Sequence, residues 1–407
     1  MSDLTELDLQ NLGEIMPSLK DVVSDLTPFL IDVRRHFHAY PELSGKECES
    51  AKTIRHHLTE AGIHWARCGM ETATVAVIEG KGPGKTVLLR ADMDALPVTE
   101  TSGLPYASCR QGIMHACGHD CHMAMLLTCA KVLEATKDQW SGTVKLAFQP
   151  AEESGEGALA MIEAGVLDDV DACFALHVWS DVPSGKVALR SGPVMAGTDR
   201  FEIHVKGVGG HGAQPHHCVD AVVAGSAIVQ QLQTLVSREV APTETAVVTV
   251  GTFEAGTRWN VVAGEAKLTG TVRTFNPALA QQLPDSLIRV VRMTAQAHRA
   301  TAEVTYVRMA LPTVNDPAVT ELAKASATKV FGQDGVYDLS PSMGGEDFCH
   351  FLAKKPGCFG FLGVRNEACG AIYGQHHSAY VVDENALPLG VMLYAQFAID
   401  FLYKNHS

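Results

Sequence analysis

The chain has 407 residues, 46% of them hydrophobic, and a formal net charge of −14. This length predicts two domains rather than one, and the composition provides ample material for hydrophobic cores. The acidic balance argues against a nucleic-acid partner, because phosphate binding needs a basic face, and it also argues against docking on an anionic membrane.

The chain begins with a segment, Met1–Lys20, that starts acidic and has no long apolar run, so it does not follow the plan of a signal peptide. No stretch of about 20 uncharged apolar residues occurs elsewhere, and we therefore expect no membrane contact. The 11 cysteines are odd in number and widely spread, unlike those of a small disulfide-bonded domain. These features predict a soluble, cytoplasmic protein with reduced thiols.

Helical patterns alternate with short β-branched runs over residues 1–195. The first helical pattern runs from Leu19 to Gly62, where apolar residues recur at helical spacing. The following elements are predicted as strands at Thr74–Ile78, Thr86–Arg90 and Gly142–Gln149, and as helices at His122–Ala135 and Gly157–Glu163. Alternation of this kind predicts a layered α/β domain with a mixed sheet.

The pattern changes near Val194 and returns to the α/β style after Pro312. The intervening elements follow the order strand, helix, strand, strand, helix, strand, which is typical of a ferredoxin-like α+β sandwich. They are Phe201–Lys206, Val219–Val236, Ala246–Thr252, Lys267–Thr274, Pro277–His298 and Ala302–Val307. We therefore expect residues 1–195 and 308–407 to fold together, with residues 196–307 inserted as a second domain.

The densest chemical signal is the run Met114–His122, in which six of nine residues are His, Cys or Asp. Thiolate, imidazole and carboxylate groups are the ligands of zinc and similar divalent ions. Cys117 and His119 are separated by one glycine, so both side chains can turn toward one point. A chance cluster at a helix N-terminus is the alternative, but the density of ligand types favours a metal site. No second Cys/His pair lies at zinc-finger spacing.

Two adjacent carboxylates, Glu152 and Glu153, follow an apolar strand in a glycine-bearing loop. Neighbouring side chains of an extended segment point to opposite faces, so one carboxylate can face a metal and the other a substrate. A metal hydrolase needs this division between a ligand and a general base. A solvated loop before a helix would also explain acidic residues here, so this pair alone does not distinguish a metal site from such a loop.

Further candidates stand at the ends of predicted strands, where ligand sites collect in α/β folds. His177 ends an apolar run, and His376 and His377 precede a serine near the C-terminus. A single histidine beside a strand is more often a structural residue, so these positions gain weight only together. Asp94 follows a buried strand and either orients a metal-binding histidine or forms a turn; we favour the first interpretation.

Two glycine-rich runs resemble phosphate-binding loops but lack the required context. Gly207–Gly212 matches G-x-G-x-x-G, yet Pro215 interrupts the helix that should follow. Gly80–Thr86 is one residue short of a P-loop and is followed by a strand, so we predict a hairpin turn there.

In order along the chain, these motifs resemble the M20 metallopeptidase family, in the amidohydrolase branch that contains hippurate hydrolases, N-acyl-amino-acid aminoacylases and indoleacetyl-amino-acid hydrolases. The resemblance spans nearly the whole chain after about Leu30. It is carried by the segments Arg35–Leu43, Leu89–Pro97, His115–His119, Gln149–Glu153, Gly209–Pro215 and Gly345–Phe348. The H-x-D-x-x-P motif of the wider family is here Asp92–Pro97, a change that the amidohydrolase branch shares while using Cys117 as a ligand.

The resemblance implies an α/β catalytic domain, a lid domain that also dimerises, and two divalent metal ions per subunit, which could be zinc, manganese, cobalt or nickel. It implies Glu152 as the general base and His211, often supplied across a dimer, as the residue that polarises the scissile carbonyl. Asn260 and Arg273 match substrate contacts of the lid. The implied metal ligands are Cys117, His119, Glu153, His177 and His377.

The expected function is metal-dependent hydrolysis of the amide bond of N-acyl amino acids or related small amides, by a homo-oligomer that is a dimer or a dimer of dimers. A dipeptidase, or an N-acetyl-amino-acid deacetylase of a biosynthetic pathway, is the alternative in the same fold. Two other classes stay open: a non-catalytic binding module, and a thiol hydrolase that uses Cys117 as its nucleophile.

Overall fold

The computed structural model describes residues 6–337 and 339–404, with side chains described for 19–337 and 339–403. The start of the segment Met1–Lys20 therefore lies outside the described residues. The chain divides into two compact units. Unit 1 contains Met1–Gly192, Val314–Ser340 and His350–Ser407, and unit 2 contains Pro193–Thr313 and Pro341–Cys349.

The boundaries of these units differ from those expected from the sequence: the first falls at Gly192 instead of residue 195, and the later ones differ more. Strand β13 (Thr301–Ala310) continues past residue 307. The segment Pro341–Cys349 groups with unit 2 rather than with the rest of residues 308–407. Its backbone explains this, because the N–H of Ser342 donates to the carbonyl of Val194 in strand β7 (Gly192–Met195). The sequence pattern could not show this pairing, since a single backbone bridge leaves no periodic signal.

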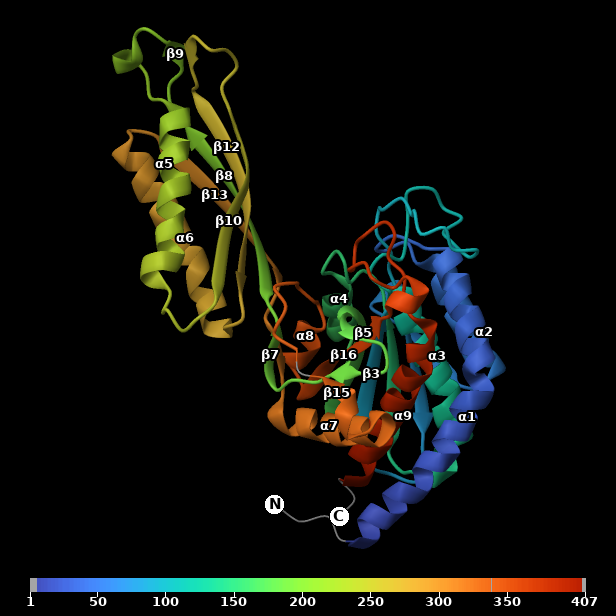
Figure 1. Cartoon of the computed structure of the whole chain (residues 1–407). Helices are drawn as coiled ribbons and strands as arrows, with labels where there is room; N and C mark the ends of the chain where they lie inside the picture. Colours follow the sequence, from blue (N-terminus) through green and yellow to red (C-terminus); the bar gives the residue numbers. More distant parts are fainter. Residues whose placement is uncertain (1–5, 338, 405–407) are drawn as a thin grey trace. The chain divides into compact units, whose positions relative to one another are not determined.

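An eight-stranded mixed sheet forms the centre of unit 1 (Figure 1). Four central strands, β4, β3, β5 and β16, lie side by side, and each neighbouring pair of them runs parallel. Strands β1 and β2 form an antiparallel edge next to β4. In sheet order the strands are β1 (His64–Cys68), β2 (Met70–Glu79), β4 (Thr143–Gln149), β3 (Thr86–Asp92), β5 (Ala172–Pro183), β16 (Gly357–Arg365), β6 (Val187–Ala188) and β15 (Val336–Tyr337). The predicted mixed α/β fold is confirmed.

The hairpin predicted at Gly80–Thr86 is wrong, because β4 lies between β2 and β3. Glu79 at the end of β2 and Thr86 at the start of β3 both pair with Thr143 of β4. The glycine-rich run therefore crosses over the end of a central strand instead of reversing into a neighbouring one. Only pairing with a strand more than 50 residues away, Thr143–Gln149, decides this.

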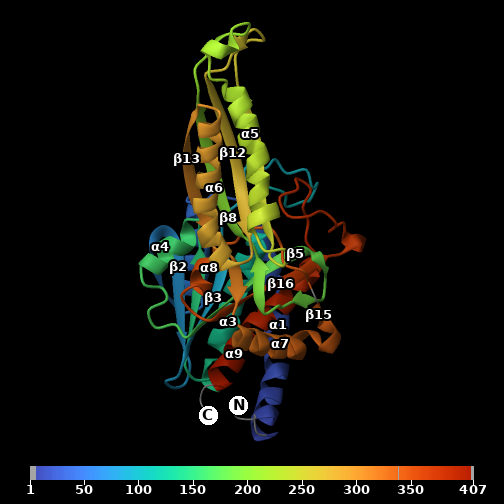
Figure 2. The same cartoon turned by 90° about the vertical axis from the view of Figure 1, so that its left-hand side faces the viewer.

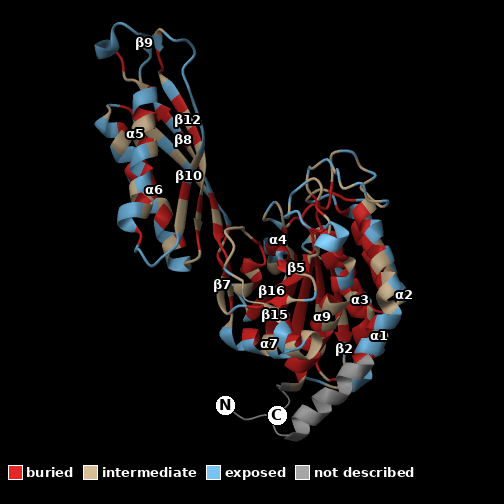
Figure 3. Ribbon diagram, in the orientation of Figure 1, coloured by how far each residue is buried: buried red, intermediate tan, exposed pale blue. Residues whose placement is uncertain are grey.

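Helices α1 (Glu6–Ala39), α3 (His119–Ala135) and α9 (Leu387–Lys404) pack against one another beside the sheet. Helix α2 (Cys48–Glu60) contacts α3 and β2, and α7 (Pro317–Phe331) contacts α9. Figure 3 shows the strands and the inner faces of these helices as the buried part of the unit. The N-terminus of α3 and the ends of β3, β4 and β5 carry the residues of interest.

Helix α9 belongs to a segment, Glu384–Tyr403, that is long and apolar enough to cross a membrane by length and composition. Inside unit 1, however, 78% of this segment is buried, as in the core helix of a globular protein. Its carboxylates, Glu384 and Asp400, are the reason why the sequence showed no uncharged span of this length. Asp400 is itself buried and lies 2.8 Å from the ammonium of Lys329.

Unit 2 contains a four-stranded antiparallel sheet with α5 (Ala221–Thr234) and α6 (Pro277–Ala297) on one face (Figure 2). The sheet order is β10 (Ala246–Ala255), β12 (Glu265–Thr274), β8 (Gly197–Lys206) and β13, the order of a ferredoxin-like sandwich. Two short strands, β9 (Gly210–His211) and β11 (Val261–Val262), pair beyond the Lys206–Glu265 end of this sheet. Strands β7 and β14 (Thr313–Asn315), where the chain passes from one unit to the other, pair as well.

Candidate metal centre

Cys117 and His119 stand at the start of α3, on either side of Gly118. Gly118 has a φ of 91°, in the left-handed region that favours glycine. A Cβ atom at this position would approach Cγ2 of Val178 to 2.4 Å and Oη of Tyr380 to 3.1 Å. Glycine therefore permits the sharp turn that aims both flanking side chains inward, as the sequence suggested.

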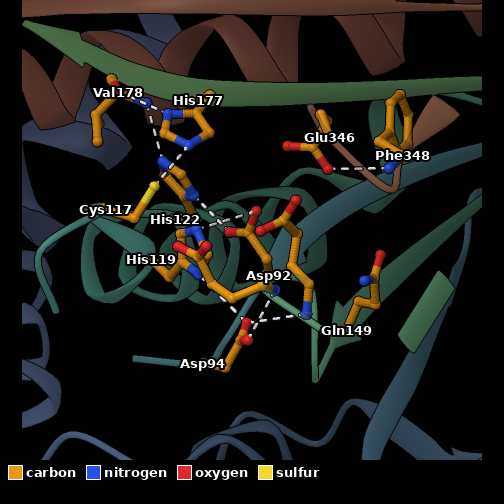
Figure 4. A network of polar contacts seen from close by, with 12 residues as sticks. Asp92, Asp94, Cys117, His119, His122, Gln149, His177, Val178, Glu346 and Phe348 are labelled. Carbon is orange, nitrogen blue, oxygen red and sulfur yellow. Dashed lines mark hydrogen bonds and ion pairs between the residues drawn. The ribbon is translucent and has the colours of Figure 1, made fainter. Parts of the chain in front are cut away.

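Strand β5 brings His177 to the same place. Its Nε2 lies 3.4 Å from Sγ of Cys117 (Figure 4). Nδ1 of His177 lies 2.7 Å from the carbonyl oxygen of Val178, and since that oxygen can only accept, Nδ1 carries the proton. Burial lowers the pKa of His177 well below its usual value. The ring is therefore neutral, with the lone pair of Nε2 directed toward the cluster.

The loop after β4 adds Glu152 and Glu153. Each places a carboxylate oxygen within 4.8 Å of a ring nitrogen of His119 and of the other carboxylate. The prediction that the two side chains face opposite ways is therefore wrong. The reason is local: residues 152–155 form turns, and Ala151 adopts a left-handed φ of 55°, so the segment is not extended.

The carboxylate of Asp94 contacts both this loop and His119 of α3. Its carboxylate accepts hydrogen bonds from the backbone N–H groups of Glu152 and Glu153, at 3.1 and 3.0 Å, and from Oγ of Ser44 at 2.6 Å. Oδ1 of Asp94 lies 3.4 Å from Nδ1 of His119. The structure thus places Asp94 where its carboxylate can orient both a histidine and the carboxylate pair.

The C-terminal histidine of the cluster is His376, not His377. Nε2 of His376 lies 3.4 Å from Oε1 of Glu153, and its ligand atom lies within 4.8 Å of those of Cys117 and Glu153. His377 instead stacks on the ring of Tyr373, with centroids 4.1 Å apart. His376 has a left-handed φ of 67°, which the spacing of residues in the sequence cannot reveal.

The donor set fits divalent cations. Among the described residues, the ring nitrogens of His119 and Oε1 of Glu153 are buried and make no well-formed hydrogen bond. Their polar neighbours are more distant: Oδ1 of Asp94 lies 3.4 Å from Nδ1 of His119, and Nε2 of His376 lies 3.4 Å from Oε1 of Glu153. Buried polar atoms that lack a well-formed hydrogen bond are rare, and a bound ion satisfies them. Burial, followed by the charge of Glu153, raises the pKa of the Cys117 thiol above its ordinary value. Without a cation this thiol stays protonated, which argues against Cys117 as a free nucleophile.

A second network beneath the cluster, formed by Arg90, Asp92 and His122, was not predicted from the sequence. Asp92 ends β3, and its carboxylate lies 2.7 Å from Nη1 of Arg90. The same carboxylate binds Nδ1 of His122 (Figure 4). The N–H of Val178 donates to Nε2 of His122 at 2.9 Å. Burial opposes ionisation of Asp92, but Arg90 and the histidines hold its pKa well below the usual value. The available signal was helical spacing, since His122 follows His119 by three residues on α3.

Glu47 was also missed, because nothing near it in the sequence points to the site. It is fully buried, and its Oε1 accepts the N–H of Ala151 at 2.9 Å from a position 104 residues earlier. Burial raises the pKa of Glu47, while the backbone donors lower it. This carboxylate supports the left-handed turn from which Glu152 and Glu153 project.

The candidate residues of unit 2 fall into two places. His211 and Asn260 lie together at the β9–β11 end, where His211 pairs with Val261 and the N–H of Gly212 donates to the carbonyl of Asn260. Arg273 lies near the other end of β12, with Nη1 bound to Oγ1 of Thr198. The strand β8 separates these places by about 25–30 Å at ~3.4 Å per residue. Unit 2 thus brings His211 and Asn260 together but not Arg273.

The chain is similar in sequence to a family of known hydrolases. Residues 88–400 match the model of peptidase family M20/M25/M40. The chain is 41% identical to thermostable carboxypeptidase 2 of Saccharolobus solfataricus, over 96% of this chain and 100% of that protein. It is 41% identical to an N-acetyl-L-cysteine deacetylase of Bacillus subtilis, over 90% of this chain and 86% of that protein.

A solved structure agrees with these relatives. The Bacillus subtilis YXEP protein, described as a dinuclear metal-binding peptidase from the M20 family, superposes with a TM-score of 0.81 at 35% identity. The match covers 93% of this chain and 99% of that one. The protein is therefore a hydrolase that acts on amide or peptide bonds. The chain belongs to peptidase family M20/M25/M40, as the sequence motifs predicted.

Proposed function

We propose that this protein hydrolyses the amide bond of N-acyl amino acids or related small amides, with two divalent metal ions per subunit. The observation that carries the proposal is the convergence of thiol, imidazole and carboxylate groups on one buried cluster, in which several ligand atoms make no well-formed hydrogen bond. The deacetylase relative, which acts on an N-acetyl amino acid by its name, supports the substrate class.

The residues that would hold the ions are Cys117, His119, Glu153, His177 and His376, the last replacing His377 in the set implied by the sequence. Zinc, manganese, cobalt and nickel all suit these donors. When bound, two such ions supply Lewis acidity that polarises a carbonyl and lowers the pKa of a nearby water. Asp94 and the Asp92–His122 pair hold the histidines in position for that role.

The chain's own residues would move the proton. Glu152 takes a proton from the attacking water and returns it to the leaving amine, so one carboxylate acts first as base and then as acid. His211 donates a hydrogen bond to the developing oxyanion. Asn260 contacts the substrate, and the guanidinium of Arg273 pairs with its carboxylate.

The arrangement of unit 2 supports a homo-oligomer, a dimer or a dimer of dimers. His211 and Asn260 lie at one end of its sheet and Arg273 at the other. A small substrate spans far less than this separation, so one copy of unit 2 does not offer all three residues to one substrate molecule. We propose that two copies contribute, with unit 2 serving as lid and dimerisation domain, and that the enzyme works in the cytoplasm.

Hydrolysis of a small panel tests the reaction class. The panel contains hippurate, N-acetylmethionine, indoleacetyl-alanine and a free dipeptide, each assayed before and after chelation and after addition of manganese or zinc. Metal-restored cleavage of an N-acyl amino acid is the expected result. If chelation leaves the activity intact, the metal mechanism is wrong. Cleavage of the free dipeptide alone would favour a peptidase, which is the activity in the name of the carboxypeptidase relative.

The variant Glu152→Gln tests the general base. It keeps the shape of the side chain but cannot accept a proton, so we expect kcat to fall by at least ~10²-fold, the usual share of general base catalysis. Metal content, measured by elemental analysis, should stay at the wild-type level. Glu163→Gln, at an exposed position of α4 (Gly157–Glu163), is the matched control and should leave kcat unchanged. Retention of most activity in Glu152→Gln would refute the assignment.

A further inference from the structure

Helix α2 carries a second cluster of metal-binding side chains in unit 1, formed by residues that the amide-cleaving centre does not use. Nε2 of His56 lies 3.2 Å from Oε1 of Glu60, and Nδ1 of His57 lies 3.2 Å from Oε2 of the same carboxylate. One ligand atom of each residue lies within 4.8 Å of the other two. The three side chains therefore present two imidazole nitrogens and a carboxylate around one point.

Helical geometry explains this convergence. Glu60 follows His56 by four residues and His57 by three, so it lies one turn further along, next to both imidazoles. The ring of His57 packs edge-on against Phe29 of α1, with centroids 5.1 Å apart, which restricts its orientation. The side chains of His56, His57 and Glu60 are 65%, 24% and 54% exposed, so an ion can reach them from solvent.

A groove of about 510 Å³ opens between α1 and α2 beside the cluster. Asp32 and His36 of α1 line it together with His56 and His57. These two residues add a carboxylate and an imidazole on the far wall. Lys52 also lines the groove, but its ammonium lies 2.7 Å from the carboxylate of Glu49, which balances its charge.

We propose that His56, His57 and Glu60 bind a divalent ion of the zinc, nickel or copper class, with water and the α1 wall of the groove completing its coordination. Two imidazoles and one carboxylate suit these ions, whereas calcium and magnesium prefer sites made of oxygen atoms. The bound ion faces both helices and links α2 to α1. This site is separate from amide hydrolysis, so its test does not depend on the function proposed above.

The test counts bound zinc in the full-length, metal-loaded protein. Wild type and the double variant His56→Ala/Glu60→Gln are dialysed against the same free zinc, and bound zinc is measured by elemental analysis. We expect the double variant to bind one zinc per chain fewer. Cu²⁺ added to wild type should also show nitrogen coupling in its EPR spectrum that the double variant lacks. Hydrolytic activity and the melting temperature in chelator should be the same in both proteins.

A matched control is His204→Ala, which removes an exposed histidine that lies 2.7 Å from Glu202 and thus offers one imidazole and one carboxylate. It should bind as much zinc as wild type. Equal zinc in wild type and the double variant would overturn the proposal. An equal loss in His204→Ala would overturn it as well, because the binding would then be a general property of exposed histidines.

Discussion

The candidate residues of unit 1 and those at the β9–β11 end of unit 2 differ in how firmly the fold holds them. Cys117, His119 and His177 are 8%, 0% and 4% exposed, and Nδ1 of His119 lies 3.4 Å from the buried carboxylate of Asp94. His211 is exposed, and its ring accepts one backbone N–H, that of Ala213, at 3.0 Å.

The difference follows from the cost of burying polar groups. A buried donor or acceptor needs a partner, so the unit 1 cluster is stable only when its atoms are satisfied by cations or by one another. An exposed histidine is satisfied by water and can act only when a substrate reaches it. The cluster in unit 1 is therefore arranged to accept cations, whereas His211 of unit 2 is open to solvent.

The sharpest test of this comparison is the adjacent pair His376 and His377. We expect His376→Ala to lose metal and nearly all activity, because its Nε2 faces Glu153 and Cys117. His377→Ala should lose the ring stacking with Tyr373 and the hydrogen bond that Nδ1 accepts from the N–H of Ala379, and keep most activity. Metal content and kcat of the two variants give the answer, and the opposite order would restore the ligand set implied by the sequence.

The next largest effect concerns unit 2. His211→Ala should lower kcat by about 10²–10³-fold, the usual loss when one hydrogen-bond donor to a developing oxyanion is removed. Metal content should not change, because His211 is not among the ligands. His217→Ala, which removes another exposed histidine of the same loop region, serves as the control. A loss of metal in His211→Ala would contradict the separation of roles between the units.

A smaller effect is expected from Asp94→Asn. The amide keeps the shape of the carboxylate but lacks its charge and accepts fewer of the hydrogen bonds from Glu152, Glu153 and Ser44. Metal affinity should fall about 10–100-fold, as for other residues that orient ligands. Competition with a chelator measures this, with the exposed Asp181→Asn as control. Unchanged affinity would leave Asp94 as a turn former only.

The smallest effect separates backbone strain from side-chain collision. Gly118 and Gly112 both have left-handed φ angles, 91° and 78°, but only at Gly118 would a Cβ strike a neighbour. Gly112→Ala should cost about 1 kcal/mol of unfolding free energy from strain alone, and Gly118→Ala about 1–3 kcal/mol more from overpacking. Denaturant unfolding compares them. Equal losses would show that the turn at Gly118 tolerates a methyl group.

The sequence by itself determined the family, the mixed α/β fold, the ferredoxin-like order of the inserted elements and most of the cluster. These features are local: hydrophobic periodicity marks each element, and Cys117, His119, Glu152 and Glu153 lie in two short runs. The order of motifs along the chain then identified the family before any distance was known.

The tertiary structure alone decided which residues meet. It selected His376 over His377 through a left-handed backbone angle, and it joined Asp92 to His122 beneath the cluster. It also placed Arg273 at the opposite end of unit 2 from His211. Backbone angles and pairings between distant segments arise from packing of the whole chain. Local sequence patterns do not predict these angles and pairings, because each depends on residues far away in the sequence.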